Sequence, residues 1–382
     1  MDSGANHPVR PPISVTSETR GVAPRTGVPI FTDMRLPSSL LPLVLAATVS
    51  ACGDGPDLVV RVSLDQVFSE ELMREFEEDT GLEVRAQYDI EQSKTVGHVR
   101  AIIEEAGRPR TDVFWNNEIA QTIRLAELGL LEPYDSPSAA GIPELFRDPD
   151  RRWTGFAARA RVLIVNTDLV PAGEEPKGTM DLFDPRWSGK CGIARPLTGT
   201  TLTHATGLYE VMGEEWARGF FEQIVSANEA GAVNLPESNG QAMTLVKNGA
   251  LAWAWTDTDD FNVARLQGAP VRRVYPDQEA GPGVLMKDGA PLGTLLIPNS
   301  VMILKDAPHP ENARRFVDWV LTREIEARLA ASRSAQIPVR EDVPRPDHVG
   351  RIGDFRAMNV RYSDIGATIG ARSGELGETF IR

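Results

Sequence analysis

The sequence predicts an α/β protein made of two lobes, and three observations support this fold class. The chain has 382 residues, and the roughly 330 that follow the N-terminal region exceed what one hydrophobic core usually holds. Segments with the composition of buried strands alternate with amphipathic helices, a pattern typical of a parallel sheet covered on both faces. No low-complexity linker appears after residue 52, so we expect two lobes joined by short crossovers.

The first half of the predicted fold contains three strand–helix units. A buried strand is predicted at 57–63, and Ser69 is predicted to cap the helix that Gly81 ends. Apolar spacing then predicts a strand at 82–88, a helix at 93–106, a strand at 111–115, and a helix marked by Ile119, Ile123 and Ala126.

The second half of the chain is also predicted to alternate strands with helices, although its sequence does not repeat that of the first half. Strands are predicted at 162–165, 192–194, 250–255 and 300–304, with an extended stretch at 293–298. Helices are predicted at 202–212, 214–224, 239–247 and 310–321. We therefore expect lobe 1 to comprise 52–161 plus 292–340, and lobe 2 to comprise 162–291 plus 341–382.

Residues 1–51 have the composition of a polar extension followed by an export signal. Met34 and Arg35 precede a ten-residue apolar run at 40–49, which is too short for a membrane span of ~20 residues. The sequence Val49-Ser50-Ala51-Cys52 then resembles the lipobox of bacterial lipoproteins. The resemblance implies a lipoprotein signal peptide and an acylated Cys52. An ordinary signal with a chance cysteine is the alternative, and the start can be Met1 or Met34.

The composition disfavours several classes of function. The chain has a formal net charge of −14 and no basic cluster, so it should repel nucleic acid and anionic lipid. Its two cysteines, Cys52 and Cys191, provide no disulfide framework and no CxxC motif. The motifs HExxH, GxSxG, the Walker loop and GxGxxG are missing, so we expect neither catalytic residues nor a catalytic cofactor.

Three segments have the chemistry of a ligand site. In the first, Thr198, Gly199 and Thr200 precede a predicted helix. Hydroxyl groups and free backbone N–H groups at the start of a helix can bind an anion. Plain N-capping of the helix is the alternative interpretation.

The second segment is acidic and follows a predicted strand. It contains Asp257, Asp259 and Asp260 within four residues. Neighbouring carboxylates repel one another unless a cation lies among them, and open α/β sheets place their ligands at the carboxyl ends of strands. The segment therefore predicts a cation site, with a solvated acidic turn as the alternative.

The third set of candidates lies at the ends of the first three predicted strands. It consists of Asp65, then Asp89 and Glu91, then Asn116, Asn117 and Glu118. Parallel strands open onto one edge of a sheet, so these groups should face the acidic segment across a cleft. Oxygen-rich, sulfur-free convergence suits a hard cation or an organic ammonium group.

Five sequence blocks together resemble one protein family, the periplasmic ferric-ion-binding proteins of ABC importers. The resemblance extends over nearly all of residues 57–340 and implies the type II periplasmic-binding-protein fold, with two lobes and a cleft that closes on ligand. The blocks are Ser63–Gln66, Ala86–Asp89, Thr111–Glu118, Trp153–Thr167 and Pro196–Thr200.

The resemblance also implies roles for individual residues. The synergistic-anion loop of the family corresponds to Thr198, Gly199 and Thr200, with Asn239 contributing. The histidine ligand corresponds to Asp65, the glutamate ligand to Asn117 with Glu118 beside it, and the paired tyrosine ligands to Asp259 and Asp260. Asp257 stands at an anion-binding asparagine position. The replacement of both phenolates by carboxylates keeps hard oxygen ligands but should weaken iron binding.

The function implied is that of a monomeric substrate-binding lipoprotein of an ABC importer. Fe(III) with a synergistic anion is the expected cargo, and an ABC permease with its ATPase is the expected partner. One alternative is a binding protein for an organic cation or aminophosphonate, such as a polyamine or aminoethylphosphonate. A metal-dependent extracytoplasmic hydrolase is the other alternative.

Overall fold

A computed structural model describes residues 55–88 and 94–381, and residues 54–382 form one compact unit. Cys52, Asp89 and Glu91, for which the sequence predicts lipidation and strand-end ligands, lie outside the described residues. None of the helices in the described part of the chain is both long enough and apolar enough to cross a membrane.

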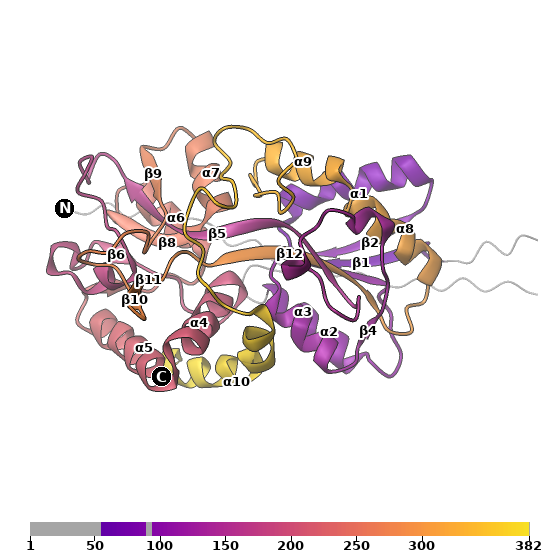
Figure 1. The fold of residues 1–382 in the computed structure, drawn as a ribbon, viewed down its shortest axis with the longest axis horizontal. Coiled ribbons are helices and arrows are strands. Elements are labelled where there is room, and N and C mark those ends of the chain that lie inside the picture. The colour runs from indigo at the N-terminus through magenta and orange to yellow at the C-terminus, as the bar shows by residue number, and fades with distance from the viewer. Residues whose placement is uncertain (1–54, 89–93, 382) are drawn as a thin grey trace, which may run out of the picture. The chain divides into compact units, whose positions relative to one another are not determined.

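The first lobe is built on a sheet with parallel strands, drawn on the right of Figure 1. Strand β1 (Leu58–Val62) pairs in parallel with β2 (Val84–Tyr88) and with β3 (Val113–Asn116). Helices α1 (Gln66–Thr80) and α2 (Lys94–Glu104) make the connections, as parallel strands require. The sheet order continues from β3 to β12 (Leu296–Leu304) and then to β5 (Thr154–Asn166), so that it reads β2-β1-β3-β12-β5. Strand β4 (Leu131–Glu132) pairs with β12.

The second lobe continues the sheet through β5 (Thr154–Asn166). This strand pairs antiparallel with β8 and β9, β8 pairs in parallel with β6, and β6 pairs in parallel with β7. The strand bounds are β6 (Cys191–Gly192), β7 (Val233–Asn234), β8 (Trp253–Asp257), β9 (Val271–Val274), β10 (Met286–Lys287) and β11 (Ala290–Pro291). The helices of this lobe are α4 (Gly199–Met212), α5 (Glu214–Glu229), α6 (Asn239–Lys247) and α7 (Thr258–Leu266).

Strands β5 and β12 (Leu296–Leu304) run from one lobe into the other, as Figure 1 shows. The first half of β5 pairs with β12, and its second half pairs with β8. Both strands are buried along their whole length. The register shifts between Pro298 and Asn299, and Ala157 on β5 has a φ of 39°. Such irregularities bend strands, and here they lie where the two lobes join.

The C-terminal helix α10 (Tyr362–Phe380) packs against α3 (Ala120–Glu127) of the first lobe and against α4 and α5 of the second. A Cβ on Gly366 would lie 2.3 Å from Cγ2 of Ile123, so only glycine permits this approach. The helix therefore contacts both lobes, whereas the sequence placed 341–382 in lobe 2. The lobe boundaries stay a prediction.

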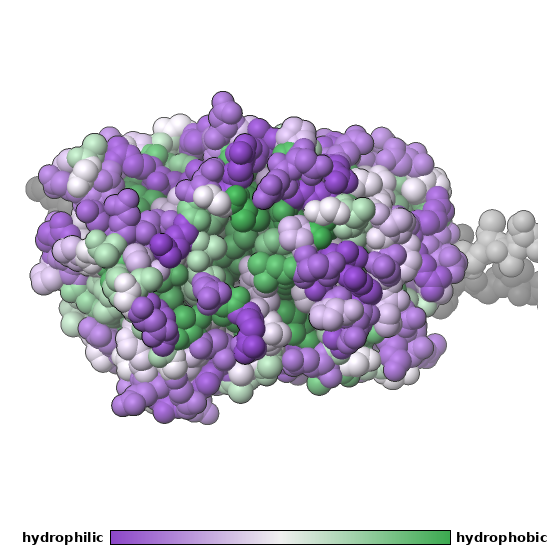
Figure 2. Space-filling view, viewed as in Figure 1, coloured by the Kyte–Doolittle hydropathy of each residue, from purple (hydrophilic) through white to green (hydrophobic). Residues whose placement is uncertain are grey.

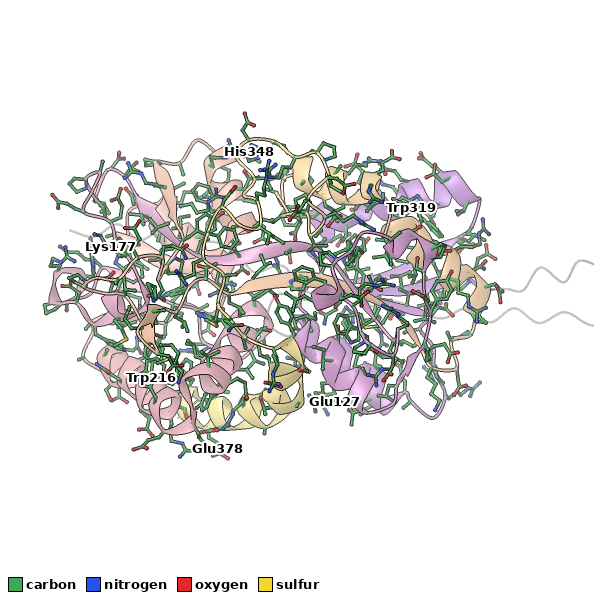
Figure 3. All side chains as sticks on the ribbon, viewed as in Figure 1. Glu127, Lys177, Trp216, Trp319, His348 and Glu378 are labelled. Atoms are coloured by element: carbon green, nitrogen blue, oxygen red, sulfur yellow. The ribbon has the colours of Figure 1, made fainter. Side chains whose placement is uncertain are left out.

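Aromatic side chains pack helix α1 against helix α8 (Pro310–Val320). Helix α9 (Arg323–Ala331) follows α8 in the chain. The ring of Phe76 meets those of Phe316 and Trp319 at 5.0 and 5.5 Å. The indole Nε1 of Trp319, labelled in Figure 3, donates to Asp79 at 3.0 Å. On the face drawn in Figure 2, hydrophobic residues gather near the middle of the molecule, and hydrophilic residues surround them.

Two expectations about local structure are corrected, and one helix has no counterpart among the predicted elements. Ser69 lies inside α1, where its Oγ donates to the carbonyls of Leu64 and Asp65, each at 3.1 Å; the helix begins at Gln66. The acidic segment is not a loop, because Asp259 and Asp260 occupy the first turn of α7. Helix α10 was not anticipated, since its glycines lower helix propensity and only tertiary packing offsets this.

Candidate functional site

A narrow cleft lies where strand ends and helix starts of both lobes meet. The ends of β1 and β3 contribute from the first lobe, and the starts of α4, α6 and α7 contribute from the second. Its lining is almost entirely polar and contains Asp65, Asn117, Arg159, Thr198, Gly199, Thr200, Asn239, Asp257, Asp259 and Asp260. No tyrosine is among the described residues that line it.

The acidic group of the cleft is formed at the junction of β8 and α7. Asp257, Asp259 and Asp260 each offer a carboxylate oxygen, and these oxygens lie within 4.8 Å of one another. Carboxylates are favoured there because the first turn of a helix carries positive dipole charge. Asp260 additionally accepts a hydrogen bond from Oγ1 of Thr256 at 2.6 Å. The group has the ligand chemistry of a hard-cation site.

Two buried arginines neutralise much of this acidic group. Arg161 lies directly opposite Asp257 in the β5–β8 ladder, and its Nη1 donates to Oδ1 of Asp257 at 2.6 Å. Arg159, two residues earlier on the same face of β5, donates from Nη1 to Oδ2 of Asp259 at 3.0 Å. The same Nη1 lies 3.6 Å from Oδ2 of Asp257. Asp257 and Asp259 therefore face two guanidinium groups rather than only the neighbouring carboxylates.

The pKa values of the two buried carboxyl groups are shifted in opposite directions. Burial alone would raise the pKa of Asp257, but Arg161, Arg159 and the Thr200 hydroxyl together lower it below its ordinary value. Burial raises the pKa of Asp259, because Arg159 offsets it only in part and Asp257 adds repulsion. Burial would lower the pKa of Arg159, yet Asp259 and Asp257 hold it above its usual value. Asp257 is thus the firmly ionised partner.

The threonine loop faces the acidic group from the start of α4. Thr198 is the N-cap residue without a side-chain capping bond, and Gly199 has a φ of 56° with open space around a hypothetical Cβ. Because the first N–H groups of a helix lack intrahelical acceptors, this start can bind an anion. The hydroxyl of Thr200, however, donates to Asp257 at 2.5 Å. Thr198 is therefore the better placed hydroxyl donor.

Asn239 connects the threonine loop to the acidic group. Its Nδ2 donates to Oγ1 of Thr200 at 2.9 Å and to Oδ2 of Asp257 at 3.2 Å. Its Oδ1 accepts from Thr201 at 3.0 Å. The amide therefore fixes these groups relative to one another.

The first lobe contributes Asp65 and Asn117 to the cleft. Asp65 stands at the start of α1, close enough for its charge to act on both Arg159 and Asp259. The amide oxygen of Asn117 accepts from Ser63 at 3.2 Å and from Thr95 at 3.1 Å, and its main-chain carbonyl accepts from Nη2 of Arg159. Asn117 is therefore connected to the acidic group mainly through its main-chain hydrogen bond with Arg159.

Glu118 does not line the cleft. Its carboxylate accepts from the backbone N–H groups of Ala120 and Gln121 at 2.7 and 3.1 Å and from Oγ1 of Thr203 at 2.9 Å. Burial, partly offset by these hydrogen bonds, raises its pKa. The arrangement indicates that Glu118 caps α3 and connects it to α4.

The sequence patterns assign no role to Arg159 or Arg161, although both lie in the block Trp153–Thr167 that carries part of the family resemblance. A usable signal was present, since two arginines spaced by two residues lie in a strand that is otherwise small or apolar. Buried arginines require counter-ions, and the acidic segment is the obvious source. Arg195, whose Nη1 lies 2.8 Å from Glu237, is a third cation of the cleft lining that was missed.

Comparison with known proteins places this geometry in context. The family described as bacterial extracellular solute-binding protein matches residues 71–354. Iron uptake protein A1 of Synechocystis is 25% identical over 341 residues, covering 84% of this chain and 89% of that protein. The major ferric iron-binding protein of Neisseria meningitidis serogroup A is 22% identical, covering 85% and 93%.

Among solved structures, iron-bound HitA from Pseudomonas aeruginosa superimposes with a TM-score of 0.71. The two chains are 23% identical, and the match covers 84% of this chain and 99% of HitA. At this identity the likeness establishes the fold. The two-lobed type II periplasmic-binding fold expected from the sequence is confirmed.

Proposed function

Because this chain belongs to the bacterial extracellular solute-binding protein family, we propose that it captures ferric iron together with an anion for delivery to an ABC permease. Proteins of this family serve transport, so the protein is a binding component and not an enzyme, and the hydrolase alternative is set aside. Its place is outside the cytoplasm, since the family is described as extracellular.

One observation carries the proposal, namely the convergence of carboxylate oxygens opposite a helix start. The oxygens of Asp257, Asp259 and Asp260 lie within 4.8 Å of one another, and the threonine loop lines the same cleft. Hard cations prefer oxygen ligands, and helix starts bind anions. The relatives named for ferric iron support iron as the cargo.

Some of the site residues would bind the cation, and others would bind the anion. Asp260 and Asp259 would offer oxygens to iron, with Asp65 available from the first lobe. Thr198 and the first backbone N–H groups of α4 would hold the anion, which would supply further oxygens. Asn117 and Asp257 would act through Arg159 and Arg161, and Glu118 would stay outside the ligand shell.

A ligand with one amine and one phosphonate group is the second candidate. The observation that favours it is the presence of both charges in one cleft, with Arg159 and Thr198 on one side and Asp260 on the other. Aminoethylphosphonate could bridge these groups without a metal. Polyamines fit less well, since they give the arginines no partner.

Lipid anchoring through Cys52 is part of the proposal and rests on the sequence motif alone. Cys52→Ser should abolish labelling with a radioactive fatty acid and release the protein into the soluble fraction. Labelling of that variant at the wild-type level would reject the anchor without affecting the ligand assignment.

Metal analysis combined with calorimetry tests the cargo. The protein, purified without chelators, should contain iron and should bind ferric citrate when titrated. The control titrations use citrate alone, a divalent metal, aminoethylphosphonate and spermidine. Tight binding of aminoethylphosphonate without metal would establish the second candidate, and the absence of ferric binding would reject the first.

A further inference from the structure

We propose that helix α10 is a further connection between the two lobes, beside strands β5 and β12, and that its glycine face on α3 sets how the lobes are rotated relative to each other. The helix moves with the second lobe and bears on α3 of the first lobe. The proposal goes beyond the proposed function, because it holds for whichever ligand enters the cleft.

Polar side chains attach α10 to the second lobe. Oγ1 of Thr368 donates to the carboxylate of Glu210 on α4 at 2.7 Å. The carboxylate of Glu375 accepts from the hydroxyl of Tyr209 on α4 at 3.3 Å and from Nε of Arg218 on α5 at 3.0 Å. Because these hydrogen bonds reach two helices of the second lobe, we expect α10 to follow that lobe when the lobes rotate.

Helix α3, in turn, is attached to the sheet of the first lobe. Oγ1 of Thr122 accepts a hydrogen bond at 2.9 Å from Nδ2 of Asn116, which ends β3. The same oxygen lies 2.8 Å from Oγ of Ser300 on the crossing strand β12. All three side chains are buried, and a satisfied buried network of this kind is rigid. Helix α3 therefore offers a fixed surface to α10.

The two helices meet at a pair of glycines, and Figure 1 shows α10 passing from α5 and α4 to α3. Gly366 and Gly370 are four residues apart, so they share one face of α10. A Cβ on Gly366 would lie 2.3 Å from Cγ2 of Ile123, and one on Gly370 would lie 3.1 Å from Cζ of Arg124. A Cβ on Gly374, by contrast, would meet open space. The glycines thus form a notch that Ile123 fills.

This notch couples the helix contact to the rotation of the lobes. Rotation about β5 and β12 must carry α10 across the surface of α3, and closely packed interfaces change between discrete arrangements rather than deforming continuously. The fit of Ile123 over Gly366 therefore favours one arrangement of the lobes. The hydrogen bond from Oγ1 of Thr203 on α4 to Glu118, at 2.9 Å, joins the lobes beside the same contact.

An alanine series along α10 tests the proposal through the distance between the lobes. Gly366→Ala requires the helices to move apart by about 1 Å, since non-bonded carbon atoms approach to about 3.5 Å. It should shift the mean interlobe distance by at least that amount and broaden the distribution. Gly370→Ala displaces only the flexible end of Arg124 and should have a smaller effect. Gly374→Ala adds the same methyl group in open space and should match wild type.

The interlobe distance is measured by double electron–electron resonance on the ligand-free protein. One spin label is attached through Glu78→Cys on α1 and the other through Glu222→Cys on α5, since both positions are exposed. The labelled proteins carry Cys52→Ser, and Cys191 is buried. Because no ligand is present, the result does not depend on the cargo, and failure of ferric citrate to bind leaves this test intact.

A matched control lies on the other side of α10. A Cβ on Gly207 of α4 would lie 3.4 Å from Cδ1 of Ile365, but α4 and α10 both belong to the second lobe. Gly207→Ala should therefore keep the wild-type distance distribution even if it lowers the melting temperature. Equal shifts in Gly207→Ala and Gly366→Ala would overturn the proposal, because any disturbance of α10 would then suffice.

A variant of α3 keeps the test decisive if Gly366→Ala does not fold. Ile123→Ala removes most of the side chain that fills the notch and should broaden the distance distribution. The melting temperature of each variant is recorded in parallel, because damage to local packing alone would lower it without moving the labels. Wild-type distance distributions in Ile123→Ala and in Gly370→Ala, or in a folded Gly366→Ala, would overturn the proposal.

Discussion

Two buried ion-pair networks in this protein differ in how many of their arginine N–H donors have a hydrogen-bond acceptor. Under the crossing strands, Glu326 accepts from Arg340 at 2.9 Å and from the backbone N–H groups of Ala157 and Val339 at 3.1 and 2.6 Å. Arg340 also donates to the carbonyls of Ser138, Leu321 and Ala140. In the cleft, by contrast, Arg159 and Arg161 keep donors without acceptors.

The difference indicates what each network is for. A fully satisfied buried pair fixes the backbone, and here it holds Ala157 at its unusual φ of 39° where the lobes join. A buried network with unused donors and crowded carboxylates is costly unless a ligand completes it. We therefore assign the first network to the hinge region and the second to ligand binding. The predictions below test this division.

The largest effect is expected at the satisfied network. Glu326→Gln leaves Arg340 buried without a counter-charge, and breaking such a pair costs about 3–5 kcal/mol. Denaturant unfolding measures the loss. Arg323→Gln, which breaks an exposed pair with Asp342, is the control and should cost less than about 1 kcal/mol. A loss at Glu326 as small as that of the control would contradict a structural role.

Removing the acidic group should abolish binding while sparing the fold. Asp259→Asn with Asp260→Asn keeps the shapes and removes both charges. Ligand binding stabilises the folded state by mass action, so ferric citrate should raise the melting temperature of wild type and not of this variant. Without ligand, the variant should still unfold cooperatively in the same scan, because Arg159 keeps Asp257 as a partner. Equal ligand-induced shifts in both proteins would mean that the carboxylates do not touch the ligand.

Removing one hydroxyl from the threonine loop should weaken binding by a smaller amount. A hydrogen bond to a charged group contributes about 1.5–3 kcal/mol, so Thr198→Val should lower ferric-citrate affinity roughly tenfold or more, as measured by calorimetry. The result for Thr200→Val would be harder to interpret, because the Thr200 hydroxyl also donates to Asp257. Unchanged affinity in Thr198→Val would return the loop to a helix-capping role.

The smallest expected effect, counted per pH unit, is on the free energy of unfolding. It comes from a histidine that is buried beside the cleft. Burial, followed by the charge of Arg161, lowers the pKa of His204 to about 3, and its ring lies 4.8 Å from that of Trp255. Below pH ~6.5 the unfolded chain takes up a proton that the folded protein refuses. Stability should therefore fall as the pH falls, by up to about 1.4 kcal/mol per pH unit between pH 6 and 4.

His204→Phe should flatten that dependence. The comparison is made by denaturant unfolding at several pH values, with His348→Phe as the control, because the imidazole of His348 is far less buried although its pKa is also lowered. A His204→Phe profile as steep as that of wild type would show that other groups set the pH dependence.

Sequence periodicity predicted the strand–helix alternation because the core strands are rich in β-branched and aromatic residues. Helix α6 has the predicted bounds of 239–247, and β1 lies inside the predicted 57–63. The first half of β5 escaped prediction because its Gly and Ala residues carry little strand signal. Helix α10 escaped because glycines interrupt its pattern, and its packing against both lobes is a tertiary effect.

The sequence predicted the acidic residues and the threonine loop of the candidate site. It did not predict the arginines that balance the acidic charge. Sequence patterns and family resemblance pointed to Asp257, Asp259, Asp260 and the threonine loop, which line one cleft. The pairing of Asp257 with Arg161 depends on the register of β5 against β8, a long-range property that local sequence does not specify. Likewise, adjacency in sequence did not show that Glu118 points into α3 rather than into the cleft.

Calorimetric titration of wild type with ferric citrate tests the account most directly. We predict saturable binding of ferric citrate that neither citrate alone nor the Asp259→Asn, Asp260→Asn variant reproduces. Wild type that binds no ferric complex, or a variant that binds it as tightly as wild type does, would contradict the account.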